Sequence, residues 1–193
     1  MRQIHHPHHR WPYLKEKSLS ILSHGKRLKG RSQKLSSVVW LWRTTNIANN
    51  RCVTAMKAPL FSLKDGQTGN ILRLEDVKGQ VVMLTFWASW CPDSQRDLEQ
   101  KWELYKQMDK AKLAFLTINV TGREGRSGDG IAYAKEHGYD FTILLDEGTT
   151  VYDQYRCMGV PTTFLLDEEL NIKYRYSDRA AFMEIMQGLS TLL

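Results

Sequence analysis

The sequence contains little cysteine. Only Cys52, Cys91 and Cys157 occur among its 193 residues. An odd number at such wide spacing fits neither a disulfide framework nor the paired ligands of a zinc site. We therefore expect a reducing compartment, and we place the protein in the cytoplasm.

The sequence also lacks a long apolar run. A membrane-spanning helix needs about 18 consecutive apolar residues, and the best candidate, Val38 to Trp42, stops at Arg43. The residues that follow are rich in Asn and Arg, whereas a secretory signal ends in small residues at its cleavage site. These absences predict no membrane partner and no export signal.

Acidic residues are nearly absent from the first part of the chain. Residues 1–55 contain eleven Lys and Arg but only one acid, Glu16, whereas residues 56–193 contain sixteen basic and twenty acidic residues. The composition predicts a basic disordered tail over 1–55 and a folded domain over 56–193. One hypothesis from this change is that translation starts at Met56. The folded part gives no reason to expect a nucleic-acid partner.

Two segments suggest a ligand but lack what a binding site needs. His5 to His9 is a histidine tract broken by Pro7, and a metal site needs ligands that a fold holds in place. Gly122 to Gly128 is glycine-rich and basic, but it lacks the Gly-Lys-Ser/Thr ending of a phosphate-binding loop. We expect a solvated loop there, and neither a metal nor a cofactor in the protein.

From residue 56 onward, apolar runs alternate with helical patterns. Short strands over 60–63 and 70–72 flank a turn at Asp65, which predicts a hairpin. Buried strands are expected over 80–87, 112–120, 141–145, 162–166 and 172–176, and helices after Pro92, over 131–137, over 150–155 and after a cap at Asp178. This order predicts an α/β domain with a central mixed sheet flanked by helices and a short N-terminal β-hairpin.

Three motifs in this order resemble one family. They are Ala-Pro-Leu-Phe-Ser-Leu at 58–63, Phe-Trp-Ala-Ser-Trp-Cys-Pro at 86–92 and Gly-Val-Pro-Thr-Thr-Phe at 159–164. Residues 57–192 thereby resemble the thioredoxin fold, and specifically the TlpA/ResA-type thiol–disulfide oxidoreductases. The resemblance implies that Pro161 is in the cis form and lies against Cys91.

The chain departs from the family pattern at two positions. Ser94 stands where the Cys-Pro-x-Cys motif has its second thiol, so the motif here is Cys-Pro-Asp-Ser. Thr85 stands six residues before Cys91, where thioredoxins carry a buried aspartate thought to move protons. The fold is therefore implied more firmly than the dithiol chemistry.

Cys91 is the expected nucleophile. A cysteine at a helix N-terminus faces unpaired N–H groups and the positive end of the helix dipole, which favours the thiolate. Ser94 lies one turn on and is expected to donate a hydrogen bond to that thiolate, but it cannot resolve a mixed disulfide. The sequence therefore predicts monothiol exchange with a disulfide-containing protein or a low-molecular-weight thiol.

The resemblance also implies a docking surface. Substrate backbone is expected beside Val160 and Pro161, with Pro92 at the start of the helix and Trp90 in the apolar rim. Trp87 is a second candidate for that rim, although packing in the core is the favoured interpretation for Trp87 and stays open for Trp90. Cys157 is interpreted as a buried aliphatic-like side chain, although a resolving role for Cys157 or Cys52 stays open.

Two other functions remain open from the residues. A peroxiredoxin-like thiol peroxidase would use Cys91 through a sulfenic acid, but its Pro-x-x-x-Thr/Ser-x-x-Cys loop is not matched, because Ala88 and either Met83 or Leu84 occupy the required positions. A redox-inactive binding domain would have kept the groove beside Pro161 and lost turnover.

Overall fold

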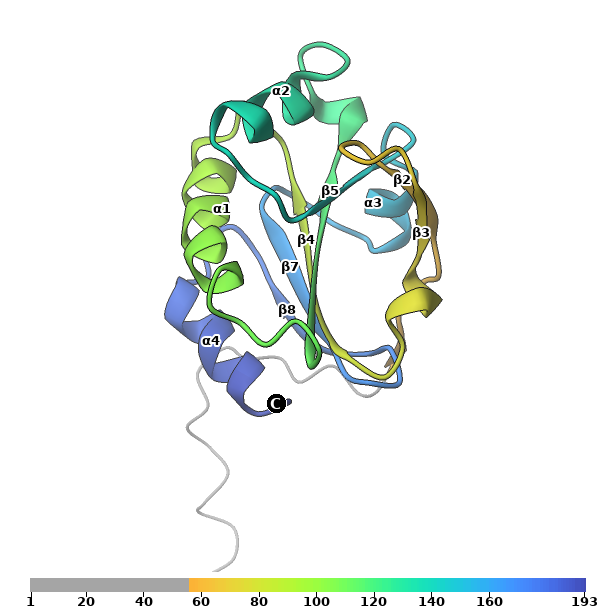
Figure 1. Cartoon of the computed structure of the whole chain (residues 1–193), viewed down its shortest axis with the longest axis vertical. Helices are drawn as coiled ribbons and strands as arrows, with labels where there is room; N and C mark the ends of the chain where they lie inside the picture. Colours follow the sequence, from red (N-terminus) through yellow and green to blue (C-terminus); the bar gives the residue numbers. More distant parts are fainter. Residues whose placement is uncertain (1–55) are drawn as a thin grey trace, which may run out of the picture. The chain divides into compact units, whose positions relative to one another are not determined.

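The computed structural model describes residues 56–193. The predicted disordered tail, the start at Met56, the His5 to His9 tract and Cys52 depend on residues outside that range and stay predictions. Residues 56–193 contain eight strands, which form one mixed sheet, and four α-helices (Figure 1). The expected α/β class with a thioredoxin fold is confirmed.

The sheet has the order β1-β8-β7-β4-β5-β6-β2-β3. Its strands are β1 (Met56–Lys57), β2 (Ser62–Asp65), β3 (Ile71–Arg73), β4 (Val81–Trp87), β5 (Leu113–Asn119), β6 (Thr142–Leu145), β7 (Thr162–Leu166) and β8 (Asn171–Tyr176). The central strands β4, β5 and β6 are parallel to one another, and the remaining pairs are antiparallel. The predicted hairpin of β2 and β3 is confirmed, and β2 also extends the sheet through β6.

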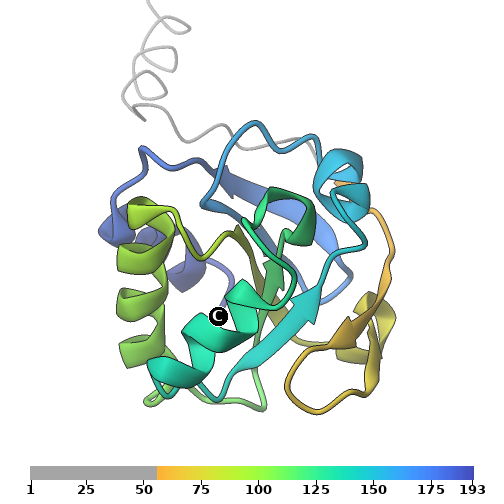
Figure 2. The same cartoon turned by 90° about the horizontal axis from the view of Figure 1, so that it is seen from above.

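Helices cover both faces of the sheet (Figures 1 and 2). The α-helices are α1 (Pro92–Tyr105), α2 (Asp129–Glu136), α3 (Thr150–Gln154) and α4 (Phe182–Ser190), and the 3-10 turns are η1 (Leu74–Val77) and η2 (Thr121–Arg123). One core cluster joins the sheet to residues of α1, α2 and α4, and the other joins it to residues of α3.

Strand β4 shows why the sheet is covered on both faces. All seven of its side chains are buried, as a near-continuous apolar run between two helical layers requires. Val82, Leu84 and Phe86 belong to the α3-side cluster, whereas Met83 and Trp87 belong to the cluster under α1. The alternation places Trp87 wholly in the core, as predicted, and it points Thr85 towards α1.

The expected cap at Asp178 is wrong. Helix α4 begins four residues later, and its N-cap is Ala181, which makes no side-chain capping bond. A turn closes first, because the Ala180 N–H donates to the Ser177 carbonyl at 3.0 Å. The polar residue therefore belongs to the turn rather than to the helix.

Candidate active site

Cys91 lies at the junction of β4 and α1. It is the N-cap residue of α1, with Pro92 at the first helical position. Its backbone carbonyl accepts the first helical hydrogen bond from the Gln95 N–H at 3.0 Å. Proline suits that position, because a helix leaves the first N–H groups without internal partners. Cys91 therefore begins a helix of 14 residues, but its thiol makes no capping hydrogen bond to the first N–H groups.

The fold brings Cys91 against Val160 and Pro161. The Cys91 Sγ donates to the Val160 carbonyl at 3.3 Å, across 69 positions of sequence. The Val160–Pro161 peptide bond is cis, as the resemblance implied. Both Cys91 and Val160 are buried, with 8% and 7% of their surface exposed. Cys91 therefore keeps only a small exposed fraction.

Ser94 occupies the first turn of α1 but does not contact the thiol by a hydrogen bond. It is fully buried, and its Oγ has no hydrogen-bond partner among residues 56–193. The expected donation from Ser94 to the Cys91 sulfur is therefore not observed, because Cys91 directs its sulfur to the Val160 carbonyl instead. A buried hydroxyl without a partner is costly, by about 1–3 kcal/mol.

Two exposed apolar side chains lie beside these residues in sequence. Trp90 directly precedes Cys91 and is 54% exposed, and its indole N–H donates to the Arg123 carbonyl at 2.5 Å. Met158, two residues before Val160, is 90% exposed. The sequence reasoning placed Trp90 in the rim but missed Met158, because a single methionine in a loop has no periodicity to mark it.

The segment before Cys91 is held by Glu124. One Glu124 carboxylate oxygen accepts from the Ser89 N–H at 2.8 Å, and the other accepts from the Ser89 hydroxyl at 2.6 Å. Asn119 also donates its side-chain amide to Glu124. Part of the glycine-rich segment, expected to be merely solvated, therefore anchors the loop that carries the thiol.

A buried lysine of α1 lies between that helix and the sheet. Lys101 has no exposed surface, and its Nζ contacts Asp97 at 2.6 Å, Thr163 at 2.6 Å and Thr85 at 2.9 Å. These three acceptors match the three protons of an ammonium group. Burial lowers the pKa of Lys101, and the neighbouring Asp97 carboxylate opposes that shift.

Sequence reasoning missed this cluster. In the sequence Thr85 stands out only as a position where thioredoxins carry an aspartate, and Asp97 does not stand out at all. One signal was present: Lys101 follows Leu98 by three residues and Asp97 by four, so it lies on the buried stripe of α1 with an acid one turn before it.

Cys157 differs from Cys91 in its surroundings. It is 7% exposed, and burial raises its pKa to about 12. A thiol needs its thiolate form to attack a disulfide. The prediction that Cys157 packs inward is confirmed, and the raised pKa argues against it as a resolving thiol.

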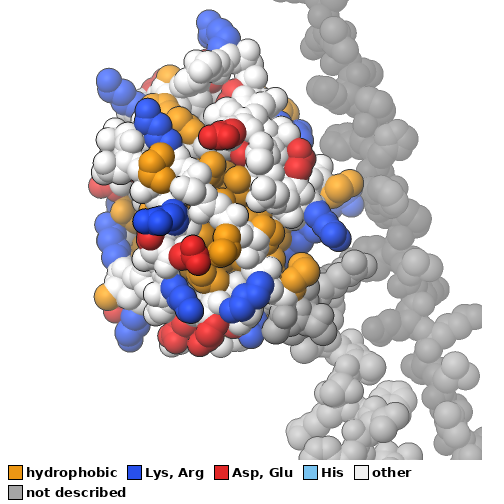
Figure 3. Space-filling model, turned by 90° about the vertical axis from the view of Figure 1, so that its right-hand side faces the viewer, with side chains coloured by type: hydrophobic (Ala, Val, Ile, Leu, Met, Phe, Trp, Pro, Cys, Tyr) orange, Lys and Arg blue, Asp and Glu red, His pale blue; other side chains and the backbone are white. Residues whose placement is uncertain are grey.

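The described part of the chain offers no metal cluster and no membrane span. Residues 56–193 contain no group of three or more His, Cys, Asp or Glu side chains placed to hold a metal ion. None of the helices in that range is long and apolar enough to cross a bilayer. On the face viewed in Figure 3, Lys and Arg are interspersed with Asp and Glu, so that face carries no cationic patch of the kind nucleic acids bind.

Comparisons with known proteins agree with this geometry. The family model described as AhpC/TSA family matches residues 54–175, more than half of the chain. The thiol-disulfide oxidoreductase ResA of Geobacillus kaustophilus (strain HTA426) is 33% identical over 131 residues, which are 67% of this chain and 73% of that protein. Thioredoxin-like protein YneN of Bacillus subtilis (strain 168) is 36% identical over 113 residues, which cover 58% of this chain and 65% of YneN, just under two thirds.

Solved structures give the same fold. The exposed lipoprotein thioredoxin Etrx1 of Streptococcus pneumoniae strain TIGR4 superposes with a TM-score of 0.61 at 27% identity, covering 69% of this chain and 100% of that one. StoA of Bacillus subtilis gives a TM-score of 0.60 at 24% identity, over 70% and 99% of the two chains. The relatives named here do not favour the peroxidase alternative. The chain belongs to the AhpC/TSA family, with a thioredoxin-like fold and with ResA-type thiol–disulfide oxidoreductases among its relatives.

Proposed function

We propose that the protein is a thiol–disulfide oxidoreductase that works by monothiol exchange through Cys91. The observation that carries the proposal is the placement of its thiols. Cys91 lies at a helix N-terminus beside the cis Val160–Pro161 bond, whereas Cys157, the other cysteine of residues 56–193, is buried with a raised pKa. The family supports the reaction class, and Ser94 supports the single-thiol form of it.

The exchange takes two steps. The Cys91 thiolate attacks one sulfur of a substrate disulfide, a new S–S bond forms, and the other sulfur leaves as a thiolate that takes a proton from solvent. A low-molecular-weight thiol, as its thiolate, then attacks the substrate sulfur of this mixed disulfide. That attack releases Cys91 as a thiolate and leaves the substrate joined to the small thiol.

Ser94 is the reason that an external thiol is needed. In a dithiol enzyme the second sulfur, one turn along the helix, would attack the mixed disulfide. A hydroxyl cannot form that S–S bond, so the mixed disulfide lasts until another thiol arrives. The partners are therefore a disulfide-containing protein and a small thiol, with no cofactor; we propose the cytoplasm as their location.

Substrate docking uses the surface around the thiol. An extended substrate segment lies beside Val160 and Pro161, and the exposed side chains of Trp90 and Met158 shield the exchanging sulfurs from water. Pro92 has no backbone N–H, so the first helical position of α1 offers no donor to the substrate carbonyl groups.

The test is a single-turnover exchange with oxidised glutathione, followed by the mass of the intact full-length protein. Cys52→Ser protein is expected to gain one glutathione on Cys91 and to lose it when reduced glutathione is added. Cys52→Ser/Cys91→Ser is expected to gain none, and Cys52→Ser/Cys157→Val serves as the matched control that still reacts. No adduct on Cys91 would support the binding-domain reading, and rapid peroxide consumption through Cys91 would support the peroxidase.

A further inference from the structure

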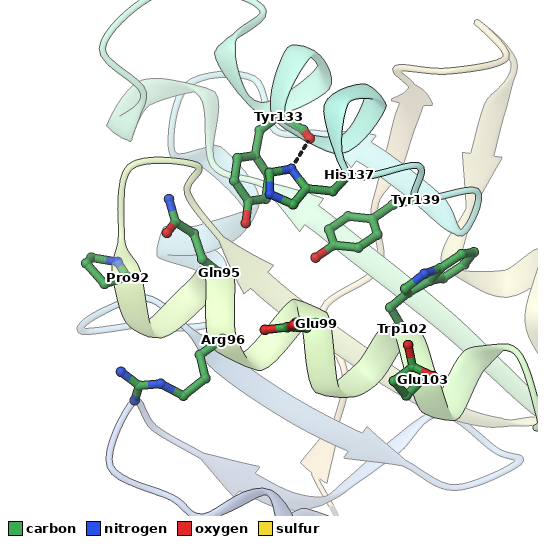
Figure 4. Close-up of a pocket in the computed structure, with 9 residues that line it drawn as sticks. All are labelled: Pro92, Gln95, Arg96, Glu99, Trp102, Glu103, Tyr133, His137 and Tyr139. Carbon is green, nitrogen blue, oxygen red and sulfur yellow. Dashed lines mark hydrogen bonds between the residues drawn. The ribbon is translucent and has the colours of Figure 1, made fainter.

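A groove of about 510 Å³ runs between α1 and α2, outside the contacts described so far (Figure 4). Helix α1 lines one side, from Pro92 at its start to Glu103. Tyr133, His137 and Tyr139 line the other side. The proposed exchange reaction uses no side chain of this groove beyond Pro92.

The groove has an aromatic wall. The rings of Tyr133 and His137 stack with centroids 4.0 Å apart and an interplanar angle of 26°. The His137 Nδ1 bonds the Tyr133 carbonyl at 2.8 Å, which fixes the imidazole in this stack. Tyr139 and Trp102 continue the wall, with centroids 5.7 Å apart. Such flat faces attract a planar cation.

The groove also contains an acid that has no ion-pair partner among the described residues. Figure 4 shows Glu99 in the middle of the groove, between α1 and the Tyr133 and Tyr139 rings. Within residues 56–193 the Glu99 carboxylate makes no ion pair, whereas Glu103 is paired with Lys106 at 2.6 Å. Arg96, the cation that lines the groove, is paired with Asp93 at 3.2 Å. The unneutralised charge of the groove is therefore negative.

The charge of Glu99 reaches both tyrosines. The pKa of Tyr139 is raised to about 12, mainly by burial, with smaller contributions from the neighbouring Tyr133 and from the Glu99 carboxylate. The same carboxylate contributes to the raised pKa of Tyr133. Both phenols therefore stay neutral at physiological pH, and they offer their oxygens as acceptors to a cationic donor.

The groove starts at the active site. Pro92 follows Cys91 directly, and the Gln95 amide donates to the Ser89 carbonyl at 2.7 Å in the loop before the thiol. Glu99 is eight residues after Cys91, or about 12 Å along a helix with a rise of about 1.5 Å per residue. An extended peptide covers that distance in about three to four residues.

We propose that this groove binds an arginine side chain of the disulfide-bearing partner, about three to four residues from the cysteine that Cys91 attacks. The inference rests on the proposed function and names its class of substrate. Arginine fits best, because its planar guanidinium stacks on aromatic rings and pairs with a carboxylate through two parallel hydrogen bonds. A lysine side chain would supply the positive charge, but its compact ammonium group would not stack on the aromatic rings.

The kinetic test uses peptides that carry one cysteine joined to thionitrobenzoate. The peptides are identical except for arginine, its neutral isostere citrulline, or glutamate, placed three residues before or after the cysteine. The full chain with Cys52→Ser attacks the peptide sulfur and releases thionitrobenzoate, whose absorbance gives the rate constant. Glu99→Gln removes the charge at nearly constant volume. Glu75→Gln, an exposed position on η1, is the matched control.

We expect the arginine peptide to react about five- to tenfold faster than the citrulline peptide, a gain typical of an exposed ion pair combined with a cation–π contact. The glutamate peptide is expected to be the slowest. Glu99→Gln should bring the arginine and citrulline rates together, and Glu75→Gln should keep them apart. Equal rates for the two peptides with unaltered Glu99, or a preference that survives Glu99→Gln, would overturn the inference while leaving the exchange function intact.

An equilibrium arm separates the two proposals. The full chain with Cys52→Ser and Cys91→Ser is titrated with peptides whose cysteine is replaced by serine, and the Trp102 indole signal is followed by NMR. A shift caused by the arginine peptide alone supports the groove even if no peptide exchanges with Cys91, which would refute the exchange function. No difference between the arginine and citrulline peptides in this titration refutes the groove.

Discussion

Replacement of Ser94 by cysteine tests the proposed monothiol exchange. Ser94 is fully buried and its hydroxyl has no partner among residues 56–193, a situation that costs about 1–3 kcal/mol. A thiol behaves as a small hydrophobe and does not carry that cost. Reduced Ser94→Cys is therefore expected to raise the free energy of unfolding by about 1 kcal/mol, as measured by urea unfolding with excess reductant.

The same variant is expected to gain a second activity. Residues three apart on a helix are neighbours, so the new thiol can attack a mixed disulfide on Cys91 and release the substrate. Catalytic reduction of an interchain protein disulfide, followed by turbidity with dithiothreitol as the electron source, should be well above that of the unaltered chain. Ser94→Ala is the control. It is expected to have a stability similar to that of Ser94→Cys and to show no gain in turnover.

Two results would refute this reasoning. A loss of more than about 1 kcal/mol in Ser94→Ala would mean that the hydroxyl has a partner that stabilises the fold. A stable Ser94→Cys protein without turnover would mean that the docking surface beside Val160 and Pro161 does not accept a protein disulfide. That result would count against a disulfide-containing protein as the partner of Cys91.

Three further predictions concern residues around the thiol. Burial lowers the pKa of Lys101 in the folded state, so the unfolded chain binds more protons than the folded chain as the pH approaches the lysine value of about 10.4. The free energy of unfolding of the unaltered chain, relative to that of Lys101→Met, should therefore rise between pH 7 and pH 10. Urea unfolding measures this difference. Glu124→Gln is expected to lose about 2 kcal/mol of unfolding free energy and to slow exchange at Cys91, with Glu75→Gln unchanged in both assays. Cys157→Val is expected to leave the exchange rate within about twofold of the starting value, since a thiol whose pKa is about 12 contributes little thiolate at neutral pH; a large loss of rate would make Cys157 a resolving thiol.

Much of the fold could be predicted because its signals are local. The apolar run of β4, the proline at the start of α1 and the Gly-Val-Pro-Thr-Thr-Phe motif each identify an element within a few residues. The neighbours of Cys91 followed from the resemblance, because a family motif carries its long-range contacts with it. Strand β1 consists of Met56–Lys57 and was missed. Two residues are too few to show an alternating pattern, and they join the sheet by pairing with β8.

The missed parts of the site depend on contacts between distant segments. Glu124 meets Ser89 across 35 positions, and Lys101 meets Thr163 across 62. Neither pair has a pattern in sequence, because each partner alone is an ordinary polar residue. The groove along Glu99 is formed in the same way, since its two sides come from α1 and from residues 133–139, which are distant in sequence.

Both Ser94 and Thr85 are consistent with the proposed single-thiol reaction. In a dithiol enzyme the second thiol must lose a proton before it attacks the mixed disulfide, and the buried aspartate of thioredoxins is thought to accept protons. In the proposed monothiol exchange Ser94 stands in place of that thiol, so no proton has to leave position 94 and no buried acid is required at position 85. Thr85 can then bond Lys101 at 2.9 Å, and the buried charge lies in the pair of Lys101 with Asp97 at 2.6 Å. The proposed single-thiol reaction therefore makes no demand for an acid at position 85, where Thr85 instead accepts a hydrogen bond from the buried ammonium group of Lys101.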